Sequence, residues 1–134
     1  MCPHQAYSGA MASQIVIETK AQYVSERSDP RQNMFLFSYR VKIANRGDKP
    51  ARLVRRHWVI TDGQGRVEEV TGKGVVGETP MIPPGATFEY SSFCPLSTPT
   101  GVMEGEYQMV GDDGVRFDAP IPPIHLIQPG VPLH

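Results

Sequence analysis

Apolar and polar residues alternate with a period of two over much of the chain. The clearest alternation covers residues 34–45, where Phe35, Phe37, Tyr39, Val41 and Ile43 are separated by polar or smaller residues. Because successive side chains of a strand point to opposite faces of the sheet, this period predicts a strand with one buried and one solvated face.

The same pattern predicts further strands, and turn formers separate them. The other predicted strands cover residues 13–24, 51–62, 66–71, 87–96, 102–110 and 115–126. Seven or eight strands at a spacing of roughly ten residues predict an all-β, antiparallel two-sheet sandwich of the immunoglobulin-like or fibronectin-III-like type. Trp58 on the third strand and a tyrosine-corner-like strand around Tyr107 favour this fold, and a small β-barrel is the alternative.

Two of these strands depart from a simple alternation. In the third, Arg56 falls on the apolar side between Val54 and Trp58, while Leu53 falls on the opposite face. This phase predicts either a β-bulge or an Arg56 side chain whose stem lies along the sheet. The last strand contains prolines, which cannot donate to a ladder and therefore predict an edge or a bulge: Pro120, Pro122 and Pro123.

Length and composition indicate one domain at residues 13–127, with a lead-in at 1–12 and a tail at 128–134. The net charge of −1 gives no global attraction to nucleic acid or to an anionic membrane, and no apolar run approaches the length of a membrane span. Only Cys2 and Cys94 occur, which favours a reducing, cytoplasmic location and a small core residue at Cys94.

A glycine-rich segment precedes the strand at 87–96 and is the main candidate site. Gly72, Lys73, Gly74 and Gly77 fit the spelling G-x-G-x-x-G, in which clustered backbone N–H groups can hold a pyrophosphate. The prolines that follow exclude the helix that a dinucleotide site needs. One hypothesis is therefore a non-helical phosphate, pyrophosphate or nucleotide site at Gly72–Gly77, with Lys73 as counter-charge and either Arg55 or Arg56 nearby.

The alternative hypothesis for the same segment is a protein contact. Val75, Val76, Met81 and Ile82 are apolar residues in a stretch whose turn chemistry predicts exposure. Exposed apolar loops beside a sheet edge are common docking sites. We therefore expect a non-enzymatic binding module whose Gly72–Pro84 loop and adjacent strand contact a protein partner.

No catalytic or metal-binding constellation is evident. His57 is flanked along its strand by arginines and Trp58 rather than by carboxylates, so we expect a structural histidine. The pairs Glu68-Glu69 and Asp112-Asp113 offer oxygen ligands for Mg²⁺ or Co²⁺, although neighbours on a strand face opposite sides. The cluster of Arg52, Arg55, Arg56 and Arg66 lacks interleaved exposed aromatics and is not typical of a nucleic-acid site.

Several linked motifs resemble the ApaG family over residues 14–127. They are Arg56-His57-Trp58, the glycine segment up to Pro80, Ile82-x-Pro84-Gly85, Phe88-x-Tyr90-x-Ser92, Pro95-Leu96-x-Thr98-Pro99 and Gly105-x-Tyr107-x-Met109. The resemblance implies a fibronectin-III-like sandwich that occurs as a bacterial protein and as a module of eukaryotic F-box and polymerase-associated proteins. It further implies a link to cobalt resistance and magnesium efflux, with no established catalytic residues.

Overall fold

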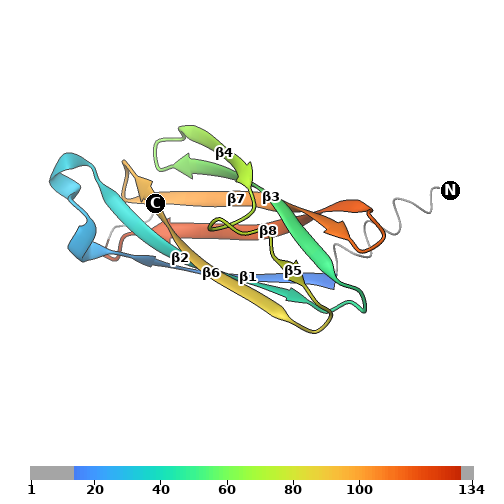
Figure 1. Cartoon of the computed structure of the whole chain (residues 1–134). Coiled ribbons are helices and arrows are strands. Elements are labelled where there is room, and N and C mark those ends of the chain that lie inside the picture. Colours follow the sequence, from blue (N-terminus) through green and yellow to red (C-terminus); the bar gives the residue numbers. More distant parts are fainter. Residues whose placement is uncertain (1–13, 131–134) are drawn as a thin grey trace.

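Eight strands form two antiparallel sheets in residues 14–130, the part of the chain that the computed structural model describes (Figure 1). The strands are β1 (Ile15–Tyr23), β2 (Phe35–Asn45), β3 (Ala51–Asp62), β4 (Val67–Lys73), β5 (Met81–Ile82), β6 (Thr87–Leu96), β7 (Thr100–Gly111) and β8 (Arg116–Ile127). Two 3-10 helices, η1 (Ser25–Arg27) and η2 (Pro30–Gln32), join β1 to β2. Neither helix in this part of the chain is long and apolar enough to cross a membrane.

The two sheets are the layers of a sandwich, which confirms the predicted fold class. One sheet has the order β1-β2-β6, and the other has the order β4-β3-β7-β8 with the short β5 paired to β3. Each predicted strand is present, and β5 is an addition inside the segment that we expected to be a loop. The predicted lead-in at 1–12 lies outside the described residues, as do the last four residues of the predicted tail.

The alternating positions of the strands supply the core between the sheets. All five apolar residues predicted to share a face of β2 are buried, and Trp58 is 2% exposed. The Trp58 ring packs edge-to-face against Tyr39 and Tyr107, at centroid distances of 5.6 and 6.3 Å. The Tyr107 hydroxyl hydrogen-bonds the Tyr90 hydroxyl. This side-chain partner replaces the backbone partner that a tyrosine corner would have, so that detail of the prediction was wrong.

Both predicted irregularities occur. The β3–β7 register shifts between Leu53 and Arg55, so a bulge lies at Val54. The bulge places both Leu53 and Trp58 in the core, which corrects the expectation that they lie on opposite faces. β8 is the outer strand of its sheet, and its register with β7 shifts where Pro122 and Pro123 stand.

The sandwich has one covered side and one open side. β1 of the first sheet packs along β8 of the second. On the opposite side, β6 and β4 are the outer strands of their sheets and are not paired with each other. The molecule is therefore a sandwich and not the closed barrel considered as the alternative. Figure 1 shows the chain after β4 descending from one layer to the other on its way to β6.

One close backbone contact tests this arrangement. A Cβ at Gly105 would lie 1.9 Å from the carbonyl oxygen of His57 on the neighbouring strand. We expect Gly105→Ala to lower the free energy of unfolding by about 1–3 kcal/mol, because β3 and β7 must separate to admit the methyl group. Urea unfolding measures this change, and the exposed Ser91→Ala is the control expected to stay within about 0.5 kcal/mol. Equal stability of the two variants would contradict the close approach.

Candidate functional site

A groove runs along the open side of the sandwich, between β6 and the β3–β4 hairpin. It consists of three hollows of about 230, 280 and 200 Å³. The first and second share Ile60, Glu68 and Pro95 as lining residues. The second and third share Arg56 and the side chains of Tyr39 and Ser92. We call these three neighbouring hollows the open groove.

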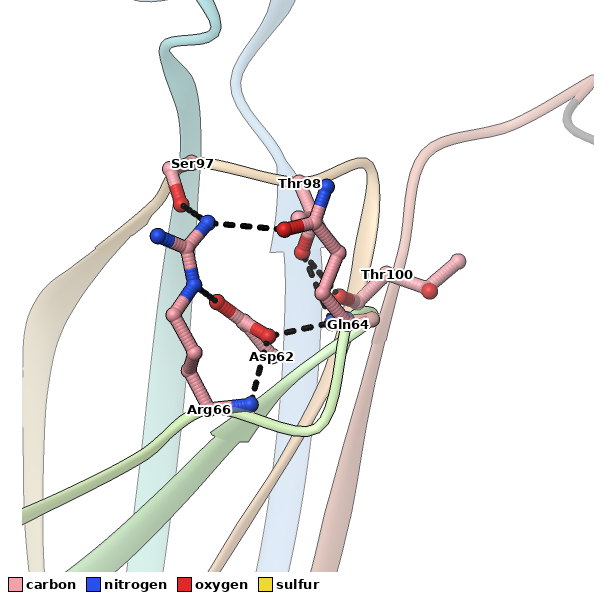
Figure 2. A network of polar contacts seen from close by, with 7 residues as sticks. Asp62, Gln64, Arg66, Ser97, Thr98 and Thr100 are labelled. Atoms are coloured by element: carbon pink, nitrogen blue, oxygen red, sulfur yellow. Dashed lines mark hydrogen bonds and ion pairs between the residues drawn. The ribbon is translucent and has the colours of Figure 1, made fainter.

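A network of polar contacts ties β3–β4 to the β6–β7 turn at the first hollow (Figure 2). Asp62 accepts hydrogen bonds from the backbone N–H groups of Gln64 and Arg66 at 2.8 and 3.0 Å. The Arg66 guanidinium donates to Asp62 at 3.2 Å and reaches the Ser97 hydroxyl at 3.5 Å. Thr98 adds a second link by accepting the Gly63 N–H at 2.8 Å. The network joins the two walls of the groove at this end.

The electrostatics of Asp62 follow from the same contacts. Desolvation opposes its ionisation, but the N–H groups of Arg66 and Gln64 and the Arg66 charge outweigh it, so the pKa of Asp62 lies below the ordinary value. These interactions therefore stabilise the fold above the ordinary carboxyl pKa and weaken as the pH falls through the pKa of the folded state. The junction between the two walls is an ionic one at neutral pH.

The second hollow has aromatic walls and a buried donor. Trp58, Val70 and Phe93 are among its lining residues. The indole Nε1–H of Trp58 is buried and has no hydrogen-bond partner within residues 14–130. Cys94 also lines this hollow, and burial, followed by the charge of Glu68, raises the pKa of its thiol to about 11. Cys94 is thus a protonated, buried thiol, in agreement with its predicted role as a core residue.

A tight turn borders the third hollow. Val75 and Glu78 exchange backbone hydrogen bonds of 2.8 and 2.9 Å, and the two residues between them, Val76 and Gly77, both have positive φ, at 44° and 81°. Two successive positive φ values are the signature of a type I′ hairpin turn. A valine in this conformation is strained, at a cost of order 1–3 kcal/mol. Val76 is also 54% exposed, so the strain does not serve to bury its side chain.

The glycines of the G-x-G-x-x-G segment have separate structural roles. A Cβ at Gly72 would lie 2.7 Å from the Arg56 guanidinium, and a Cβ at Gly74 would lie 2.0 Å from the Glu78 carbonyl oxygen. Gly77 supplies the second positive φ of the turn. The N–H groups of Gly74 and Val75 donate to Val54 and Glu78 inside the chain. Most of the expected phosphate cradle is therefore occupied by the protein itself.

Arginines hold this segment against β3. Arg56 donates to the carbonyl oxygens of Lys73 and Gly74 at 3.3 and 2.9 Å, and Arg52 donates to that of Thr79 at 2.7 Å. Arg56 lines the second and third hollows and is the only charged residue lining the third, whereas Lys73 lines none of the three. Arg56 is therefore the cation that lines the second and third hollows, while Arg66 lines the first.

The predicted apolar contact surface divides into two parts. Val76 and Met81 are about half exposed, at 54% and 49%. Val75 and Ile82 are 0% and 2% exposed, so the expectation that they lie on the surface was wrong. The segment folds inward because β5 pairs with β3 and carries Ile82 into the core. Phe93 of β6, 53% exposed, is an apolar residue beside the groove that the segment-based prediction did not include.

The predicted cation ligands do not converge. Glu68 lines the open groove, whereas Glu69 contacts His57. Asp113 accepts the backbone N–H of Val115 at 3.0 Å in its turn. Within the described range, no three His, Cys, Asp or Glu side chains are grouped in a way that could hold a metal ion.

His57 has carboxylate partners that the sequence pattern missed. Its Nδ1 lies 2.9 Å from Glu106 of β7, and its Nε2 lies 3.2 Å from Glu69 of β4. The expectation of a histidine without carboxylates holds along β3 but is wrong across the sheet, because strand pairing supplies both partners. The hydrogen bond with Glu106, and next that with Glu69, raises the pKa of His57. His57 lines none of the three hollows, so this cluster links three strands outside the groove.

Comparisons with known proteins agree on one family. The family model of the ApaG domain matches residues 25–111. A relative named Protein ApaG from Aromatoleum aromaticum is 51% identical over 117 residues, which are 87% of this chain and 92% of the relative. A second, from Pseudomonas aeruginosa, is 51% identical over 87% of this chain and 93% of its own. A crystal structure of the ApaA protein from Bordetella pertussis superimposes with a TM-score of 0.85 at 48% identity, covering 87% of this chain and 95% of that one.

The His57 cluster makes a pH-dependent prediction. We expect an NMR titration to give a His57 pKa above the ordinary value of 6.5, and Glu106→Gln to lower it more than Glu69→Gln does. Since the folded pKa is raised, the stabilisation is complete below 6.5 and is lost as the pH rises through the folded value. A His57 pKa at or below 6.5 in the unmodified protein would contradict this pairing.

Proposed function

This chain belongs to the ApaG domain family, and on that basis we propose that it is a non-enzymatic interaction module that binds an extended segment of a partner protein in the open groove. The proposal refines the contact surface expected from the sequence, namely the Gly72–Pro84 loop and the adjacent strand, which is β6. The single observation that carries it is an unpaired strand edge beside a groove.

The register of β6 indicates which backbone groups are available. Asn45 of β2 bonds to Ala86, whereas its neighbour Arg46 bonds toward β1. Antiparallel ladders alternate in this way. The backbone N–H and C=O groups of the even-numbered residues of β6 therefore point toward β2, and those of the odd-numbered residues point away from it. The outward N–H groups are those of Glu89, Ser91 and Phe93. An added strand would pair with these three donors and with the carbonyl groups of the same residues.

Two of the other outer strands, β8 and β1, are less suited to strand addition than β6. β8 contains Pro120, Pro122 and Pro123, which cannot donate to a further strand, and β1 is covered by β8. β6 has a single proline, Pro95, close to its end and in an outward-facing position of the register. Its preceding positions form an uninterrupted pairing edge of the kind that peptide-binding sheets use.

The size and chemistry of the groove support a peptide rather than a cofactor. Each hollow alone is smaller than the about 300–1,000 Å³ of sites for drug-sized ligands, so a ligand that fills the groove has to extend over several of them. Hollows of this size in a row match side chains that alternate along a strand. The exposed Val76 and Phe93 line the groove as apolar contacts. On this proposal, an association with cobalt resistance or magnesium efflux is an indirect consequence of the protein partner.

A second candidate is an anion site in the third hollow. Arg56 is the only charged residue lining it, and the hydroxyl-bearing Tyr39, Tyr90 and Ser92 line it as well. The N–H groups of Val76 and Gly77 lie at the turn that borders it. These groups would bind a phosphate or pyrophosphate of a small molecule, with Arg56, and not Lys73, as the counter-charge.

Strand addition has a specific signature in hydrogen exchange. We expect peptides selected from a random twelve-residue display library against the full chain to slow exchange at the amides of Glu89, Ser91 and Phe93, because these donors gain partners. The amides of Tyr90 and Ser92, which face β2, are the internal control and stay unchanged. Protection elsewhere, with exchange at these three amides unaffected, would exclude β6 as the docking strand.

The strained turn provides a variant that separates binding from folding. Val76→Gly removes an apolar contact but relieves the positive φ, so we expect weaker binding of a selected peptide by about tenfold at equal or higher stability. Isothermal calorimetry and thermal unfolding measure the two quantities. Binding that is unchanged in Val76→Gly would remove the loop from the contact surface.

The anion candidate predicts a local response to inorganic pyrophosphate. Titration should shift the amide signals of Val76 and Gly77, and Arg56→Gln should weaken the binding roughly tenfold or more through loss of charge-assisted hydrogen bonds. Mg²⁺ without pyrophosphate serves as the control for a cation effect. If the Val76 and Gly77 signals stay fixed in the unmodified protein, the third hollow does not bind this anion.

A further inference from the structure

The free edge of β6 has few of the features that keep sheet edges from pairing with other chains. Exposed edges are usually blunted by bulges, prolines or lysines, or are covered by another element. The β2–β6 register runs from the Ala44 and Thr87 pair to the Phe35 and Leu96 pair without a shift, so β6 has no bulge against β2. Its sequence holds no lysine, and its one proline, Pro95, lies near its end. Such an edge is able to pair with the same edge of a second copy of this chain.

A two-fold axis would pair β6 antiparallel with itself, and one register uses its outward backbone groups best. The backbone groups of Thr87, Glu89, Ser91 and Phe93 point away from β2. A register that pairs Glu89 with Ser91 of the second copy also pairs Thr87 with Phe93, and it leaves Pro95 outside the ladder. The neighbouring register on one side places Pro95, which cannot donate, opposite Thr87. The neighbouring register on the other side places Glu89 opposite its own copy, where like charges destabilise the pair.

The charges on the outer face of the three-stranded sheet fit this register. Arg40 of β2 lies opposite Ser91 of β6 on one side and opposite Lys20 of β1 on the other. Two cations are therefore neighbours, and among the described residues only Glu89 lies within ion-pair distance of either, 3.5 Å from Arg40. In the favoured register, Glu89 of the second copy lies beside Ser91, in the same row as Arg40 and Lys20. The second copy thus adds a carboxylate to a row that has two cations.

The side chain between the opposite charges is small enough to let them meet. Ser91 separates Arg40 from Glu89 of the second copy, and neighbouring strands lie about 4.8 Å apart. The side chains of Arg40 and Glu89 are 59% and 45% exposed, so both are free to extend across the serine. If Ser91 were paired with its own copy instead, the two Arg40 side chains would share a row and repel each other.

We propose that this chain forms a two-fold dimer through β6, in which Glu89 of each copy pairs with Arg40 of the other. The two three-stranded sheets then become one sheet with the strand order β1-β2-β6-β6-β2-β1. The dimer covers the same edge that the proposed partner segment uses, so the second copy and the segment exclude each other. This inference goes beyond the proposed function and does not depend on it.

Two single charge reversals test the dimer, because a two-fold contact brings residue 40 of each copy to residue 89 of the other. Arg40→Glu leaves two glutamates at each contact, and Glu89→Arg leaves two arginines. We expect each variant alone to associate roughly tenfold or more weakly than the unmodified chain. An equimolar mixture of the two should regain the dimer, since both contacts then join opposite charges. Analytical ultracentrifugation over a roughly thousandfold range of concentration measures the mass.

A control variant and hydrogen exchange show whether the effect belongs to β6. Arg55→Glu makes the same change of charge at an exposed strand residue of the other sheet, and it should dimerise like the unmodified chain. Exchange at the amides of Ser91 and Phe93 should be slower in the mixture than in either reversed variant alone, and slower in the unmodified chain as its concentration rises. The amides of Tyr90 and Ser92, which face β2, should stay unchanged.

The dimer is overturned by an unmodified chain that stays monomeric over this range, by reversed variants that dimerise as well as it does, or by a mixture that stays monomeric. Equal weakening by Arg55→Glu would also overturn it. If the unmodified chain is monomeric and selected peptides protect the β6 amides, the dimer is wrong and the strand-addition proposal stands. If the dimer forms and no peptide selected against the monomeric Arg40→Glu variant protects those amides, the proposed function fails and the dimer stands.

Discussion

The contact of Arg56 with the glycine segment is the interaction on which the open side of the molecule depends. The guanidinium lies 2.7 Å from the position that a Cβ of residue 72 would take, and it donates to the carbonyl oxygens of Lys73 and Gly74. These bonds keep the chain folded toward the core as it leaves β4, so that Val75 is fully buried. The segment that follows β4 therefore does not fill the space between β6 and the β3–β4 hairpin, and Arg56 lines that space.

The sandwich itself was predictable because a period of two is a local property of the sequence. The five inward positions of β2 and the prolines of β8 required no knowledge of the neighbouring strands. The break in the apolar-polar alternation around Arg56 indicated an irregularity in this strand. The break alone did not distinguish a bulge, which the structure has at Val54, from an Arg56 side chain extended along the sheet. Because only two residues of β5 pair with β3, the strand is too short to show an alternating pattern in the sequence. The burial of Ile82 was therefore not predicted.

The candidate site was less predictable because its partners come from different strands. The G-x-G-x-x-G motif predicted an anion-binding loop. In the structure, Gly72 instead lies against the Arg56 guanidinium, and the N–H of Gly74 donates a hydrogen bond to the carbonyl oxygen of Val54. The carboxylates beside His57 are 12 and 49 residues away along the chain and meet it only through pairing. The lack of an acceptor for the Trp58 indole N–H among residues 14–130 cannot be predicted from a sequence, since any nearby carbonyl oxygen could have accepted its hydrogen bond.

Strand addition along β6 and selection of a particular partner would depend on different groups of the molecule. Backbone pairing along β6, as proposed, would supply affinity with little regard to sequence, because every peptide carries the same N–H and C=O groups. Selectivity would then have to come from the side chains that line the hollows beside the strand. A binding edge without such contacts would pair with any exposed strand, which makes a sheet edge prone to aggregation. The exposed Val76 and Phe93 and the charge of Arg56 are therefore what the open groove offers for selectivity beyond the backbone of β6.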